Sequence, residues 1–281
     1  MICADLHVHS NFSSDGKAKM EDMIDKAIKL GLKTLCFTDH MDYDYPKIYD
    51  YSFQFDIDNY LKKLQILKEK YKSQIEILIG LELGMQPHIS DSMYKLINSF
   101  PFDFIIGSIH IVNQMDPYYP QYWENITEEE GIVKCFEEIQ KCCEIYQGFH
   151  VCGHIDYVVR YAPSSKIKYQ EYSYPYYKDV LDEILKTLLN HGKGIEVNTS
   201  GYKYGLGHPH PKTEILKRYK ELGGEIITIG SDAHLPQHLC YDFDKAEALL
   251  KNLGYKYYTI FKEGKPNMIK SASSTVSKFC P

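Results

Sequence analysis

The feature that most limits how this chain can fold is a regular alternation of short apolar runs with helical patterns. Seven runs rich in Ile, Val and Phe are too short for surface helices, so we expect them to be strands. They cover residues 2–9, 34–39, 75–82, 104–110, 149–155, 194–198 and 226–231. Because each helix returns the chain to the same edge, the strands should be parallel. Seven units favour an α/β fold with a closed or distorted barrel, and an open doubly wound sheet also fits.

The helical stretches carry their own start and stop signals. Met20 and Met23 begin an apolar stripe at helical spacing, and Gly31 offers a stop. Thr127 and Glu130 have the spacing of a capping box. Three long connections are rich in Tyr and Pro, namely residues 41–55, 113–124 and 157–177. Loops of this length in a compact domain are commonly functional lids or walls.

Length and charge narrow the class of protein. The 281 residues suit a single domain over residues 1–281, although two small domains are also compatible with this length. The formal charge of -6 and the absence of a strongly basic stretch disfavour a stable nucleic-acid partner. We see neither a signal peptide nor an apolar run of the ~18 residues that a membrane span needs. We therefore expect a cytoplasmic protein with no membrane partner and with reduced thiols.

Metal-binding side chains stand at the C-terminal ends of six of the seven predicted strands. They are His7, His9, Asp39, His40, Glu82, His110, His154, Asp232 and His234. The sixth strand ends in Glu196 and Asn198, which are also polar. In βα barrels the active site is built at this rim. Two residues that are two apart on a strand, such as His7 and His9, point to the same face.

The residue types at this rim indicate a shared metal site. Imidazole and carboxylate together suit zinc, iron or manganese. A carboxylate such as Glu82 can bridge two ions about 3.5–4 Å apart. A lone histidine at a strand end is more often structural, but coincidence at six strand ends is far rarer. His208 and His210 stand apart from these ends, and they either line the pocket or belong to a plain loop.

Five short motifs follow one another along the chain. They are Asp5-Leu6-His7-Val8-His9-Ser10, Phe37-Thr38-Asp39-His40, Gly107-Ser108-Ile109-His110, Gly153-His154-Ile155-Asp156 and Gly230-Ser231-Asp232-Ala233-His234. In this order they resemble the motifs of the PHP (polymerase and histidinol phosphatase) family of phosphoesterases. Residues 196–201, residues 205–207 and Arg160 add a narrower likeness to its monofunctional histidinol-phosphate phosphatases. The resemblance implies a distorted (β/α)7 barrel, similar to a TIM barrel, with its active site at the C-terminal ends of the strands.

By position in these motifs, the resemblance also implies a centre of two or three divalent ions (Zn, Fe or Mn). The first ion would be held by His7, His9, Glu82 and Asp232, the second by Glu82, His110 and His154, and the third by Asp15, His40 and His234. Asp15 with Gly16 reads equally well as a turn, so both two and three ions stay open. Asp39 is expected to orient a ligand.

The activity that the resemblance implies is hydrolysis of L-histidinol phosphate, a small phosphorylated substrate, in histidine biosynthesis. Hydroxide held by the metals would attack, because bound metal lowers the pKa of water from about 15.7 towards ~7. Arg160 would clamp a phosphate oxygen, or it forms a surface salt bridge. Asp232 would orient the hydroxide or take its proton, and His234 would protonate the leaving alkoxide. The alternative is a PHP-type phosphoesterase acting on nucleotides or nucleic-acid ends; a non-catalytic metal-binding domain is a further one.

Overall fold

The centre of the computed structural model, which describes residues 1–164 and 166–270, is a sheet of parallel strands. The strands are β1 (Ala4–Val8), β2 (Thr34–Phe37), β3 (His40–Asp42), β4 (Glu76–Gly84), β5 (Phe104–Ser108), β6 (Val151–Cys152), β7 (Gly194–Asn198) and β8 (Ile227–Gly230). Their order is β1-β2-β4-β5-β6-β7-β8, with the short β3 also paired to β4. Ala4 lies opposite Thr34, and Thr34 lies opposite Glu76.

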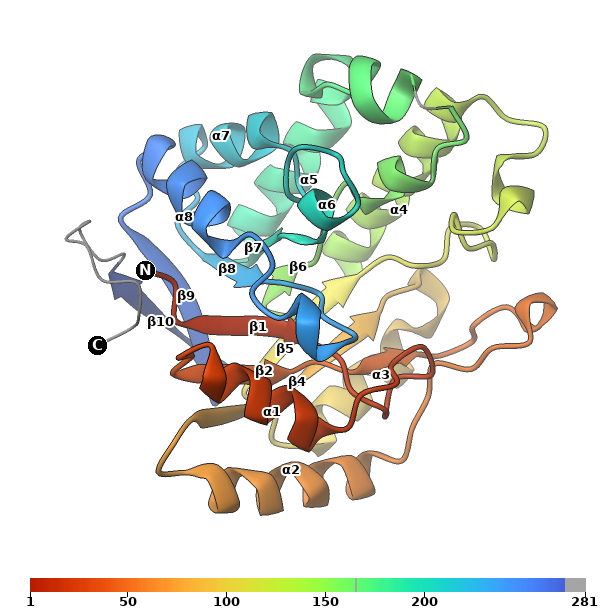
Figure 1. Cartoon of the computed structure of the whole chain (residues 1–281). Helices are drawn as coiled ribbons and strands as arrows, with labels where there is room; N and C mark the ends of the chain where they lie inside the picture. The colour runs from red at the N-terminus through yellow and green to blue at the C-terminus, as the bar shows by residue number, and fades with distance from the viewer. Residues whose placement is uncertain (165, 271–281) are drawn as a thin grey trace.

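The sheet closes between its first strand and the segment that follows its last strand. The Asp232 N–H donates to the His7 carbonyl at 2.9 Å, and the His9 N–H donates to the Ala233 carbonyl at 2.9 Å. The Ser231 N–H also donates to Asp5 Oδ1 at 2.9 Å. These bonds give the molecule the shape of a nearly closed barrel, so the prediction of a distorted seven-stranded barrel is confirmed (Figure 1).

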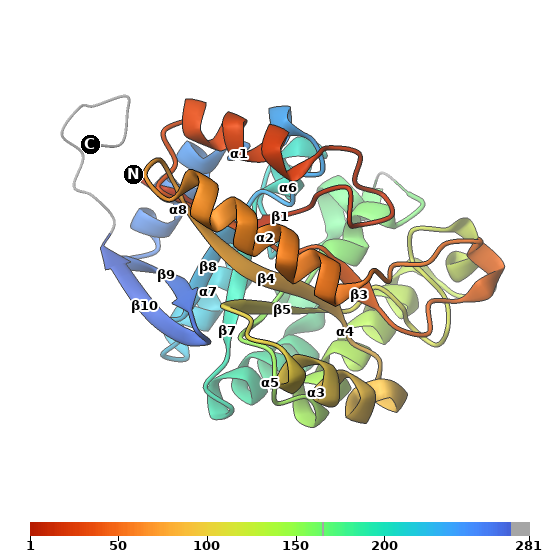
Figure 2. The same ribbon diagram turned by 90° about the horizontal axis from the view of Figure 1, so that it is seen from below.

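Helices connect the strands and surround the barrel, as Figures 1 and 2 show from two directions. They are α1 (Met20–Lys29), α2 (Ile57–Tyr71), α3 (Ser90–Ser99), α4 (Glu128–Ile145), α5 (Lys178–Asn190), the short α6 (Ser200–Lys203), α7 (Thr213–Glu221) and α8 (Phe243–Asn252). The capping box of α4 is confirmed, since Thr127 Oγ accepts from the Glu130 N–H and Glu130 Oε2 accepts from the Thr127 N–H. Gly31, at φ 78°, follows α1 as predicted. Within the described ranges, no helix is long and apolar enough to cross a membrane.

The three long connections contain short helical turns and follow the C-terminal ends of strands. The turns are η1 (Lys47–Tyr49), η3 (Pro120–Trp123), η4 (Tyr157–Tyr161), η5 (Ile167–Glu171, a π-helix) and η6 (Tyr174–Tyr177). Two more turns, η2 (Pro87–Ile89) and η7 (Pro236–His238), lie elsewhere. The first two connections pack together, because the rings of Tyr49 and Tyr119 stack with centroids 4.0 Å apart. These connections therefore form a wall above the strand ends.

A C-terminal hairpin, which the sequence reading missed, covers the opposite end of the barrel. Strands β9 (Tyr257–Lys262) and β10 (Lys265–Lys270) are antiparallel, and both turn residues between them have positive φ. The hairpin lies beside the start of β1, away from the long connections (Figures 1 and 2). Its Phe261 ring packs 5.3 Å from Phe104 and 4.8 Å from His150. The run of β-forming residues in β9 was the signal for it.

His150, beneath this hairpin, should make stability depend on pH. The Ile105 N–H donates to His150 Nδ1 at 2.9 Å, so this nitrogen must be unprotonated, and burial lowers the pKa of His150 to about 4. In the unfolded chain the pKa is about 6.5, so acidification from pH 7 to pH 5 protonates the unfolded state alone and lowers stability. A His150→Asn side chain can accept the same bond but does not titrate. Between pH 7 and 5, urea unfolding should show the wild type losing about 1–2 kcal/mol more than His150→Asn. Equal losses in both proteins would contradict this role.

Candidate metal centre

The predicted ligands converge on Glu82, a side chain on β4 with no solvent exposure. Its Oε1 lies 2.9 Å from His154 Nε2 and 3.2 Å from His110 Nε2. Its Oε2 faces three further ring nitrogens, at 3.1 Å in His7, 3.4 Å in His9 and 2.9 Å in His40. One carboxylate therefore stands between two sets of imidazoles, as a bridging ligand would.

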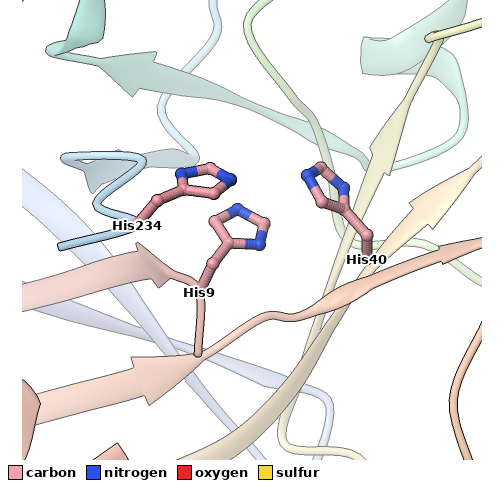
Figure 3. A group of neighbouring side chains, drawn as sticks. All are labelled: His9, His40 and His234. Atoms are coloured by element: carbon pink, nitrogen blue, oxygen red, sulfur yellow. The ribbon is translucent and has the colours of Figure 1, made fainter. Parts of the chain in front are cut away.

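The remaining predicted residues extend this cluster towards the surface. Asp232 Oδ1 lies 3.5 Å from His9 Nε2, and Asp15 Oδ2 lies 3.1 Å from His234 Nε2. Asp15 Oδ2 also lies 3.7 Å from His40 Nε2. The rings of His9, His40 and His234 gather over the ends of the strands (Figure 3), with centroids 4.3 Å apart for His9 and His40 and 4.1 Å apart for His9 and His234.

Unpartnered buried atoms test whether this cluster fits metal ions. Over the described ranges, no hydrogen-bond partner is found for Glu82 Oε2 or for four ring nitrogens, Nε2 of His7, His9 and His234 and Nδ1 of His40. Buried polar atoms normally have a partner, so such a concentration calls for an explanation. Ligand atoms lie within 4.8 Å of one another in several groups, including His7, His9 and Glu82; Glu82, His110 and His154; and His9, His40 and His234. Divalent cations would satisfy these atoms, and the residues therefore fit a polynuclear metal centre.

The charges of the cluster favour an ionised carboxylate. Burial raises the pKa of Glu82, but His7, His40 and other imidazoles outweigh it and hold the pKa well below its usual range. Burial lowers the pKa of His7, but the Glu196 and Glu82 carboxylates outweigh it and raise that pKa well above its usual value. For His9, burial and the nearby imidazoles lower the pKa instead. Glu82 is thus an anion that is ready to bind a cation.

The outer nitrogens of several rings are held by residues to which the sequence reading gave no role. His7 Nδ1 lies 2.6 Å from Glu196 Oε1, and His110 Nδ1 lies 2.7 Å from Asp42 Oδ2. Since carboxylates accept only, both Nδ1 atoms carry a proton, which leaves Nε2 as the nitrogen of each ring that a metal ion could bind in place of a proton. Glu196 had been noted only as a polar strand end, and Asp42 lay in a segment predicted to be a loop. The available signal was a spacing of two residues from another polar residue on the same strand, since Asp42 follows His40 on β3 and Glu196 precedes Asn198 on β7.

Serine hydroxyls complete this support. Ser13 Oγ donates to Asp39 Oδ1 at 2.8 Å and lies 3.1 Å from His9 Nδ1, so it accepts from this ring. Asp39 therefore acts on His9 through Ser13, in line with the expectation that it orients a ligand. Ser108 Oγ donates to Glu82 Oε1 at 2.7 Å. Hydroxyls are too common in the sequence for either contact to be predicted.

Gly230 lets β8 approach the cluster closely. A Cβ atom at this position would lie 2.3 Å from His7 Cβ and 2.6 Å from Glu196 Oε1. Any larger residue would displace the His7 ring or its carboxylate anchor. Steric contact with His7 and Glu196 therefore explains why the Gly230–His234 motif begins with glycine.

A cavity of about 500 Å³ opens over the cluster. Its other wall carries Arg160 and a set of aromatic side chains from the long connections. Arg160 Nη2 donates to the Tyr161 hydroxyl at 2.6 Å, and the guanidinium lies 4.6 Å from the centre of the Tyr204 ring. In the described part of the chain Arg160 forms no ion pair, so the surface salt bridge considered above is not what the structure contains.

The loop histidines lie outside this cavity. His210 is fully buried, and its Nδ1 lies 2.6 Å from Asp156 Oδ1. His208 Nδ1 lies 2.8 Å from the Pro209 carbonyl. Neither residue lines the cavity, so the prediction that places them in the pocket is wrong, and His210 is bridged to Asn198 at the end of β7.

The chain is similar to known proteins over nearly its whole length. A histidinol-phosphatase of Lactococcus lactis subsp. lactis is 31% identical over 269 residues, which are 92% of this chain and 93% of the relative. A probable histidinol-phosphatase of Clostridium acetobutylicum is 34% identical over 256 residues, covering 90% of this chain and 94% of the relative. The crystal structure of the Lactococcus lactis histidinol phosphate phosphatase, complexed with zinc, L-histidinol and phosphate, superposes with a TM-score of 0.86. That match has 28% identity and covers 95% of this chain and 99% of the other.

The family model described as the PHP domain matches residues 5–200. This range is well over half of the chain and contains seven of the nine residues that the sequence placed at the metals. The motifs that suggested the resemblance therefore reflect common descent, and the chain belongs to the PHP domain family.

Proposed function

We propose that this chain is a metal-dependent phosphatase that hydrolyses L-histidinol phosphate to L-histidinol and inorganic phosphate, a step of histidine biosynthesis. The observation that carries the proposal is Glu82, a buried carboxylate whose two oxygens face five imidazole nitrogens beneath a cavity. The substrate is supported by relatives that match nearly the whole chain and are named histidinol-phosphatases. One of them has been seen with zinc, L-histidinol and phosphate.

We assign the ligands of two or three ions by their positions around Glu82. The first would be held by His7, His9, Glu82 and Asp232, the second by Glu82, His110 and His154, and the third by Asp15, His40 and His234. The third set is the most exposed, with 24% of the His234 side chain and 39% of the Asp15 side chain accessible. Nitrogen and carboxylate donors of this kind suit zinc, iron or manganese.

The residues around the cavity have different roles in the hydrolysis of the phosphate ester. When bound, the ions lower the pKa of water so that a nucleophile exists near neutral pH, and they offset charge on the phosphoryl oxygens. Arg160 donates a hydrogen bond to Tyr161 and forms no ion pair with a carboxylate in the described chain. Its remaining guanidinium N–H groups can donate to a phosphate oxygen. Asp232 orients the attacking water or takes its proton, and His234 gives a proton to the leaving alkoxide. Asp232 Oδ1 and His234 Nδ1 lie 3.6 Å apart at the cavity.

We also propose that residues 1–281 work as one catalytic domain in the cytoplasm. The packing of Phe261 against Phe104 and His150 supports the single domain, since it joins the hairpin to the barrel. The described residues include six free thiols, at Cys36, Cys135, Cys142, Cys143, Cys152 and Cys240, which favour a reducing compartment. Cys3 is disulfide-bonded, so the expectation that all thiols are reduced is wrong for this residue.

Phosphate release tests the function directly. Metal-replete protein should release phosphate from L-histidinol phosphate, and prior chelation should abolish this release because the nucleophile depends on the ions. A nucleoside monophosphate serves as the competing substrate. Turnover of the nucleotide together with no turnover of histidinol phosphate would discard the proposed substrate and favour the nucleotide phosphoesterase.

Removal of one ligand should lower both metal content and activity. His110→Ala leaves Glu82 Oε1 with one imidazole, so the metal-to-protein ratio should fall and kcat/KM should drop at least ~100-fold. Metal analysis and steady-state kinetics give the two readings, with circular dichroism as a check on folding. His88→Ala is the matched control, because half of the His88 side chain is exposed and its partner is Asp44. Near-wild-type activity of His110→Ala would refute the metal assignment.

Arg160 should act mainly on substrate binding. Arg160→Ala removes a charged donor from the phosphate, so KM should rise about 10- to 100-fold, and Arg160→Lys should recover part of the loss. Arg218→Ala is the control, since Arg218 pairs with Asp182 instead. An unchanged kcat/KM for Arg160→Ala would remove this residue from the site.

A further inference from the structure

One carboxylate on the cavity wall is held in place without belonging to the metal cluster. Asp116, between β5 and α4, lines the cavity. Its Oδ2 accepts from the Tyr45 hydroxyl at 2.5 Å, and its Oδ1 accepts from the Tyr118 N–H at 2.7 Å. Its own N–H donates to the Tyr49 hydroxyl at 3.2 Å. The carboxylate therefore has a fixed direction before any ligand arrives.

Asp116 differs from the other carboxylates of the cavity in having no basic partner. Asp42 lies 2.7 Å from His110 Nδ1, and Asp15 and Asp232 lie beside His234. For Asp116, neutral donors are the hydrogen-bond partners found in the described chain, and no lysine, arginine or histidine there forms an ion pair with it. Burial raises its pKa, although the hydrogen bonds from Tyr45 and Tyr118 act in the opposite direction. A cation from outside the chain would complete this site.

The aromatic rings next to Asp116 also favour a cation. Tyr119 stacks on Tyr49 at 4.0 Å, and Tyr118 packs at 5.0 Å from Tyr119 and at 5.4 Å from Tyr161. The faces of such rings attract ammonium groups, and a carboxylate among them adds a charged hydrogen bond. Arg160, which faces the same cavity, suits an anion instead. The cavity thus contains both a cationic side chain, Arg160, and an anionic one, Asp116, which do not pair with each other in the described chain.

We propose that Asp116 binds the ammonium group on the alcohol portion of the substrate and so determines which phosphate esters are accepted. This inference rests on the proposed function, because L-histidinol phosphate carries a phosphate and a primary amine on one short chain. Asp116 is then a specificity residue rather than a catalytic one, since the reacting phosphorus lies at the metal cluster. Tyr45 and Tyr118 position its carboxylate.

The test compares Asp116→Asn with the wild type on two esters that differ only in the amine. These are L-histidinol phosphate and its deamino analogue, 3-(imidazol-4-yl)propyl phosphate. The ratio of their kcat/KM values should fall about 10- to 100-fold in Asp116→Asn, which is the size of one charged hydrogen bond. The change should appear mostly in KM. Asp91→Asn, at an exposed position on α3 outside the cavity, is the matched control and should keep the wild-type ratio.

Binding gives a second reading that does not depend on turnover. Calorimetry should show L-histidinol binding to Asp116→Asn at least ~10-fold more weakly than to the wild type. An equal loss of kcat/KM on both esters, or an unchanged ratio, would overturn the proposal. If the wild type turns over neither imidazole ester, the proposed function fails by itself. The comparison of 2-aminopropyl phosphate with propyl phosphate, in wild type and Asp116→Asn, then tests Asp116, and an unchanged ratio of their kcat/KM values would again contradict the proposal.

Discussion

The burial of the Glu82 charge is the constraint on which the rest of the site depends. A carboxylate taken out of water costs several kcal/mol unless charged or hydrogen-bonded partners surround it. β4 places Glu82 inside the barrel with no exposure, and the partners come from β1, from β3 and from the segments after β5 and β6. A flat sheet would leave these strands too far apart. Closure between β1 and the segment after β8 is therefore as much a requirement of the metal centre as of the fold.

A second layer of acceptors fixes how the imidazoles present themselves. Glu196, Asp42 and Ser13 each accept a hydrogen bond from the Nδ1–H of one ring, so Nε2 of that ring points inward. This orientation is the one that metal ligation by these rings would require. The Nε2 atoms of His7 and His9 face the carboxylates of Glu82 and Asp232 but form no hydrogen bond with them.

The sequence allowed the barrel and the inner cluster to be predicted because both follow from periodicity. Polar residues at the ends of parallel strands must share one rim, so His7, Glu82 and His154 could be placed together without a model of any loop. The β9–β10 hairpin was missed although its strand pattern was present, and Asp42 was missed because its short strand lies in a segment rich in turn residues. That the long connections would form a wall could be predicted from their length, but the shape of that wall could not. Its form depends on contacts such as Tyr49 with Tyr119, between loops that are far apart in the chain.

The side chains of the metal cluster and those of the cavity wall come mostly from different parts of the chain. The metal cluster is held mainly by strand ends, whereas Arg160 and the tyrosines of the wall belong to long connections between strands and helices. Strand ends tolerate little change, because a shifted strand would separate Glu82 from its imidazoles. Loops tolerate substitution and insertion more readily. In evolutionary terms, a descendant of this scaffold could acquire a new leaving group by remodelling its loops while inheriting the same machinery for breaking the phosphate ester.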